Sequence, residues 1–129
     1  MAQDILARGD ERLAAAGVPG IQGPPDANGV LVIWDSADPK MCPYQNAMML
    51  AEITLVIETD EPSAPDGVIF AGSSGGGLYD SFLETDEVIV AEDGFEKTYR
   101  PRSQHVRLIY VNGPTKPGKW RMSLTTRVG

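Results

Sequence analysis

The residues best suited to chemistry lie in a glycine and serine run, residues 72–76, which read Gly-Ser-Ser-Gly-Gly. This run matches the G-x-S-x-G pattern, with Ser74 in the nucleophile position after a short apolar segment. Acids follow at Asp80 and Asp86, and the single histidine, His105, comes later. That is the chain order of an α/β-hydrolase triad, in which histidine accepts the serine proton and a carboxylate orients the histidine.

The surroundings of this run argue against a hydrolase. That fold needs a tight strand-to-helix turn and a parallel sheet with crossover helices, and the segment after Gly77 has no room for them. A phosphate-binding loop is also excluded, because Leu78 stands where the Lys-Ser/Thr pair would close it. We therefore interpret residues 72–77 as a flexible loop and His105 as a surface or hydrogen-bonded strand residue. The protein is predicted to be no enzyme and to bind no cofactor.

Metal-binding patterns give no assigned site. One histidine and one cysteine, Cys42, cannot assemble a zinc site of the usual nitrogen and sulfur ligands within one chain. Two acidic clusters do offer the oxygen ligands that calcium prefers: Asp60, Glu61 and Asp66, and then Asp86, Glu87, Glu92 and Asp93. Neither follows the EF-hand spacing, so we interpret both as solvated acidic loops. The sequence leaves calcium binding there open.

The charged residues are sorted along the chain. Residues 41–96 carry twelve acids and no base, whereas residues 97–129 carry eight bases and no acid, in a chain of net charge −7. Acidic and basic strands could pair within one sheet, or faces of opposite charge could join copies of the molecule. We expect the second arrangement in at least one contact between copies, and we expect salt to weaken that contact.

The basic tail also resembles a nucleic-acid surface, because its bases alternate with Tyr99, Tyr110 and Trp120. The bases concerned are Arg100, Arg102, Arg107, Lys116, Lys119, Arg121 and Arg127. A chain of net charge −7 and pI about 4.5 is repelled by a polyanion over most of its surface. Nucleic acid is therefore disfavoured as a partner.

Short apolar segments separated by glycine and proline predict an antiparallel β-sandwich or barrel of about six to eight strands. Strands are expected over residues 30–34, 49–58, 68–71, 87–91, 104–111 and 119–128. Residues 78–83 could form a strand or a helical turn, and residues 95–99 lead onward from a turn at 92–94. The last two strands flank a seven-residue loop and are predicted to pair as a hairpin.

Alternation along these strands also predicts the core. The side chains expected to be buried are Trp34, Ile53, Leu55, Ile57, Val88, Val90, Leu108, Tyr110, Trp120 and Met122. Residues 30–34 form a continuous apolar run and are expected to be buried on both faces of a sheet.

The N-terminal part of the chain differs from the β-region. Residues 4–16 predict a short helix with Leu6 and Leu13 on one side, next to the small residues Ala2, Gly9 and Ala16. Gly17 and Pro19 end it, and an extended arm follows to residue 29. We expect an N-terminal helix and arm over residues 1–29 and a single β-domain over residues 30–129. A helix this short must dock to persist, and a neighbouring molecule is one candidate.

Bulk properties bound the remaining possibilities. A chain of 129 residues suits one domain with its own core, and a single cysteine excludes an internal disulfide framework. No apolar run reaches the length of a membrane span, and the acidic start differs from a signal peptide. We expect a soluble protein made in a cytoplasm, with no membrane partner.

An N-terminal arm, a compact β-domain, glycine- and proline-rich loops and no active site together resemble the small structural proteins of tailed bacteriophages. The resemblance is to the capsid decoration or cement proteins and the head–tail connector proteins. It implies a non-enzymatic virion protein, made in the bacterial host, that grips copies of itself and a larger capsid or neck protein. Decoration of a capsid is the first expectation and a connector or tail component the second. A small-ligand-binding β-barrel, with residues 72–77 over its mouth, is the main rival.

Overall fold

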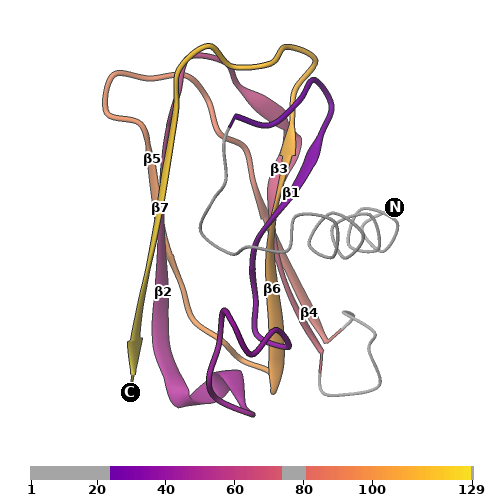
Figure 1. Cartoon of the computed structure of the whole chain (residues 1–129), viewed down its shortest axis with the longest axis vertical. Coiled ribbons are helices and arrows are strands. Elements are labelled where there is room, and N and C mark those ends of the chain that lie inside the picture. Colours follow the sequence, from indigo (N-terminus) through magenta and orange to yellow (C-terminus); the bar gives the residue numbers. More distant parts are fainter. Residues whose placement is uncertain (1–23, 74–80, 129) are drawn as a thin grey trace.

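The computed structural model describes residues 24–73 and 81–128, whose seven strands form two antiparallel sheets facing each other (Figure 1). The strands are β1 Val30–Asp35, β2 Leu50–Thr59, β3 Ser63–Ser73, β4 Phe82–Asp86, β5 Phe95–Tyr99, β6 His105–Asn112 and β7 Trp120–Val128. The four-stranded sheet has the order β1-β6-β3-β4, and the three-stranded sheet has the order β5-β2-β7. This confirms the mainly β, sandwich-like architecture.

The sheets do not close into a barrel. Within the described residues, no strand of one sheet pairs with a strand of the other, so β1, β4, β5 and β7 are edge strands. The barrel alternative is therefore wrong. The helix expected over residues 4–16 lies outside the described residues, and the one described helical element is a 3-10 turn, η1 (Ala47–Met49), capped by the side chain of Asn46.

The core lies between the two sheets. Ile53, Leu55 and Ile57 of β2 are fully buried and face Phe70 of β3 and Leu108 of β6, as the period-two pattern predicts. Trp34, Val88 and Tyr110 are also buried as expected. Trp120 and Met122 are only partly buried, because they lie on the edge strand β7. Val90 is 47% exposed, so its predicted burial is wrong.

The predicted hairpin is also wrong. β6 pairs with β1 and β3, whereas β7 pairs with β2 in the opposite sheet. The segment between them therefore crosses from one sheet to the other, and Trp120 meets Tyr110 in an edge-to-face contact, ring centroids 5.1 Å apart, rather than as a cross-strand neighbour. Sequence proximity favours a hairpin between β6 and β7. However, β2 is longer than β6, and its pairing with β7 extends from Leu50↔Val128 to Thr59↔Trp120.

The strand expected over residues 87–91 is displaced. The chain forms β4 just before it, over Phe82–Asp86, and residues 87–91 leave the sheet. Ser63 forms hydrogen bonds with both backbone polar groups of Val88. The Ser63 N–H donates to the Val88 carbonyl (3.0 Å), and the Ser63 Oγ accepts from the Val88 N–H (2.9 Å). Beyond Ser63 the β3 strand is irregular, since Pro65 has no N–H and Asp66 has a positive φ of 52°. The irregular start of β3 therefore has no regular row of backbone hydrogen-bonding groups with which residues 89–91 could pair. β3 also begins earlier than the strand predicted over residues 68–71.

Candidate functional site

The described part of the triad is not assembled. Ser74 and Asp80 lie outside the described residues. His105 begins β6 opposite Ser73, whereas Asp86 pairs with Val68, near the middle of β3. Five residues of strand separate the two levels, about 16 Å at ~3.3 Å per residue. Asp86 therefore does not orient His105.

Asp86 instead joins the two sheets along their open side. Its Oδ2 accepts from Lys97 Nζ at 2.6 Å and from the Tyr99 hydroxyl at 3.3 Å, and both donors belong to β5 of the opposite sheet. Burial, together with the charge and hydrogen bond of Asp86, raises the pKa of Tyr99 above its usual value. The contact ties the β4 edge of one sheet to the β5 edge of the other.

The acidic clusters do not form a metal site in the described residues. No three histidine, cysteine, aspartate or glutamate side chains there come close enough to hold a metal ion. Asp60 Oδ1 accepts from the Gly118 N–H at 3.0 Å, and Asp66 Oδ1 accepts from the Thr85 hydroxyl at 3.0 Å. Asp60 and Asp66, two members of the first cluster, thus bind separate partners.

Most bases of the tail are paired within the chain. Six of the eight tail bases form ion pairs in the described residues: Lys97–Asp86, Arg102–Glu84, Arg107–Asp35, Lys116–Asp26, Arg121–Glu58 and Arg127–Glu52. Four of these acids belong to the acidic stretch of residues 41–96. Pairing of acidic and basic strands inside one molecule, the first of the two arrangements considered, is thus present. Most of these pairs are exposed and contribute on the order of 0–1 kcal/mol each.

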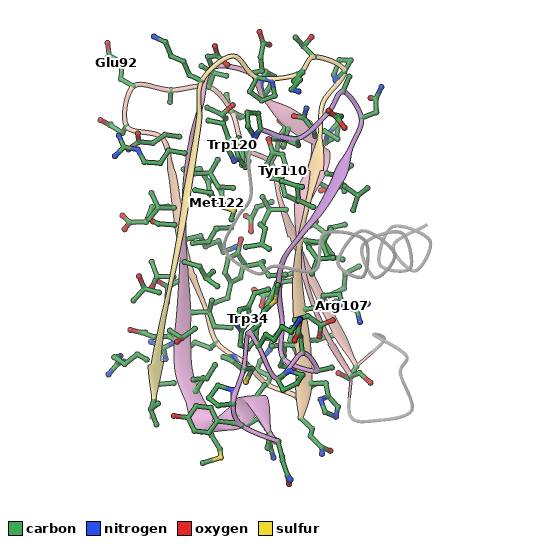
Figure 2. All side chains as sticks on the ribbon, in the orientation of Figure 1. Trp34, Glu92, Arg107, Tyr110, Trp120 and Met122 are labelled. Carbon is green, nitrogen blue, oxygen red and sulfur yellow. The ribbon has the colours of Figure 1, made fainter. Side chains whose placement is uncertain are left out.

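The basic tail does not form a nucleic-acid surface of the expected kind. Tyr99 and Tyr110 are buried in the core, so their rings cannot stack on bases. Arg107 is buried as well, on the side of β6 opposite Tyr110 (Figure 2). Alternation along a strand places neighbouring residues on opposite faces, and this separates the bases from the aromatic rings.

A cleft lies at one end of the sandwich, and we call it the end cleft. It has a volume of about 550 Å³ and combines the end of β2, the start of β7 and the β4–β5 connection. Its lining residues are Glu58, Thr59, Asp60, Val90, Ala91, Glu92, Gly94, Lys119, Trp120 and Arg121. Five of these ten residues are charged. Trp120 lies on the inner side, and Glu92 lies at the outer end of the molecule (Figure 2).

The β4–β5 connection, residues 87–94, gives this end an unusual surface. Ile89 is 66% exposed and Val90 is 47% exposed, in a segment that also presents Glu87, Glu92 and Asp93. None of these three acids has an ion-pair partner in the described residues. Neighbouring exposed apolar side chains mark contact surfaces more often than isolated ones do. The Val-Ile-Val run was visible in the sequence, where it was predicted as a strand.

A second, shallower cleft of about 630 Å³ lies beside η1 and the start of β4. Arg102 covers the ring of Phe82 there, with its guanidinium carbon 4.4 Å from the ring centroid, and Met48 is exposed at its rim. The Arg102 guanidinium is thus already in contact with the Phe82 ring of the same chain. Among the described residues, Arg102 is the one charged residue that lines this cleft, whereas five charged residues line the end cleft.

Among the described residues, no helix has the length and apolar character needed to cross a membrane. Comparison of the chain with protein-family models, with curated proteins and with solved structures finds no match in any of the three.

Proposed function

We propose that this protein is a non-enzymatic structural protein of a tailed-phage virion, which decorates or cements the capsid through its end cleft and β4–β5 connection. One observation carries the proposal: Ile89 and Val90 stand exposed beside each other, outside both sheets and next to a cleft. Exposing them costs solvation free energy, which a contact with another molecule would recover.

The chemistry of the end cleft suits a protein partner better than a small ligand. A small-molecule pocket buries apolar groups inside and places a few polar groups among them. Five of the ten residues that line the end cleft are charged, and its apolar wall residue Val90 is 47% exposed, next to Ile89, which is 66% exposed. The unpaired acids Glu87, Glu92 and Asp93 favour a partner surface that carries basic as well as apolar groups. A larger capsid protein is the first candidate, and another copy of this chain is the second.

Incorporation into particles tests the proposal. Tailed-phage particles carrying this gene would be purified and probed with gold-labelled antibody against the protein. Particles should be labelled with wild-type protein, and Ile89→Asp should reduce labelling at least tenfold while its unfolding midpoint stays unchanged. Val128→Asp is the matched control, because Val128 is similarly exposed but lies at the opposite end of β7 from the end cleft.

Two outcomes would overturn the proposal. Detection of the protein in infected cells and never on particles would exclude a virion role. Alternatively, Ile89→Asp could be incorporated as well as Val128→Asp, which excludes the end cleft as the contact.

A further inference from the structure

The outer face of the four-stranded sheet is buried although it points away from the sandwich core. Val30, Val32, Ile69, Ala71 and Ile109 form a second apolar cluster there, and none is more than 5% exposed. Val32, Ile109 and Ile69 lie in one row across β1, β6 and β3. A sheet face in contact with water would expose these side chains, so something must cover it.

The next row on the same face is an ion pair that is also buried. Arg107 Nε donates to Asp35 Oδ2 at 3.1 Å, and the two side chains are 7% and 5% exposed. Arginine and aspartate are almost never withdrawn from water this far unless a layer lies over them. The cover therefore extends past the apolar row to the Asp35–Arg107 pair.

The cover ends at β3. Leu83 and Thr85 of β4 continue the same rows, opposite Ala71 and Ile69, and both are exposed. The covered strip is thus three strands wide, about 10 Å between the outer strands, and about 20 Å long over the six residues of β1. One helix of about thirteen residues has these dimensions, since it is ~10 Å across and rises ~1.5 Å per residue.

Within residues 24–73 and 81–128, no helix or strand lies over this face (Figure 1). Residues 74–80 join the neighbouring ends of β3 and β4, beside the exposed Leu83. Residues 1–23 join the chain at the opposite end of the sheet. There the Asn112 side chain donates to the carbonyls of Pro25 and Asp26, at 3.5 and 3.0 Å, and the Asn28 N–H donates to Gly113.

We propose that residues 1–23 cover this face of their own chain, with the apolar side of the predicted helix over residues 4–16 seated on Val32, Ile69 and Ile109. The sequence supplies the matching stripe, because Leu6 and Leu13 fall on one side with Ala2, Gly9 and Ala16 between and beside them. Small residues let the segment approach the sheet closely. The inference is independent of the proposed function, and it assigns the N-terminal segment to its own sheet rather than to a neighbour.

Paramagnetic relaxation in the full-length chain tests this directly. A spin label would be attached at Asp10→Cys in a Cys42→Ser background, and methyl signals would be recorded. The methyls of Val32, Ile69 and Ile109 should lose more than half their intensity, whereas Val56, on the outer face of the other sheet, should lose little. Adding Leu13→Asp should restore the three signals. Ala15→Asp, which places the same charge on the other side of the predicted helix, should not.

A mixed sample separates this chain's segment from a neighbour's. Spin-labelled protein without isotope labels would be mixed with isotope-labelled protein that has no spin label. No broadening is expected in that mixture. Broadening there would show that the segment docks on another copy, and intact outer-face methyls in both samples would show that it docks elsewhere; either result overturns the proposal.

Discussion

At the scale of single residues, burial changes the protonation of a tyrosine hydroxyl in the core. Tyr110 is fully buried between the sheets, and its hydroxyl has no hydrogen-bond partner among the described residues. Burial raises the pKa of Tyr110 to about 12 from its ordinary value near 10. The folded chain thus keeps this hydroxyl protonated over a pH range in which the unfolded chain loses the proton.

Tyr110→Phe should therefore reduce the loss of stability at high pH. A raised pKa in the folded state means that stability is intact below about pH 10 and falls as the pH approaches 12, because the unfolded state releases its proton first. At neutral pH the variant should be as stable as wild type or more so, since no hydrogen bond is lost. Urea unfolding from neutral pH to pH 12 measures the stability of the variant and its loss at high pH. Tyr44→Phe is the control, because Tyr44 is only partly buried. The prediction would be contradicted if Tyr110→Phe lost as much unfolding free energy at high pH as wild type.

Arg107→Met should be strongly destabilising, by about 3–5 kcal/mol, because it leaves the Asp35 carboxylate buried without its partner. Replacing both residues, as Asp35→Leu with Arg107→Met, should recover much of the loss. Arg121→Met breaks an exposed pair with Glu58 and should cost less than about 1 kcal/mol. Denaturant unfolding of the four proteins provides the comparison, and equal costs for Arg107→Met and Arg121→Met would refute the buried role.

At the scale of elements, β7 is held by its ladder with β2 and by one row of partly buried side chains. Trp120, Met122 and Leu124 pack against the core from an edge strand, and Trp120 meets Tyr110 across the sandwich. Trp120→Ala should cost about 2–3 kcal/mol, near the lower end of the range for large apolar residues, because the ring is only partly buried. Met49→Ala, at an exposed side chain, should change stability by less than about 0.5 kcal/mol. Thermal unfolding would detect the difference, and a Trp120→Ala midpoint equal to wild type would show that β7 is not anchored by this row.

At the scale of the whole molecule, the ion pairs change the expected effect of salt. Among the described tail bases, six are paired within the chain, and the surface near the end cleft keeps unpaired acids. Copies of the molecule therefore repel one another at low salt, and screening removes that repulsion. If Ile89 and Val90 join copies, self-association should rise with salt. Sedimentation velocity of wild type and Ile89→Asp at low and high salt measures this. A mass that falls as salt rises would instead favour attraction between opposite charges, as the charge sorting alone suggests.

Local patterns were enough to predict β1, β2, β6 and β7 as strands. The alternation in β2 identified both a strand and its inward face, and the continuous apolar run of residues 30–34 predicted burial on both sides. These properties depend on a residue and its immediate neighbours, since a strand alternates with period two wherever it lies. The same reasoning failed for residues 87–91, where β-branched residues had no regular hydrogen-bonding partner.

Only the tertiary structure decided which segments meet. The sequence by itself determined a β-rich domain, its main inward-facing residues and its sorted charge. It could not determine that β7 pairs with β2 rather than β6, that Arg107 is buried against Asp35, or that the end cleft combines β2, β7 and the β4–β5 connection. Pairing between distant strands depends on competition among all possible partners, and no local pattern records the outcome of that competition.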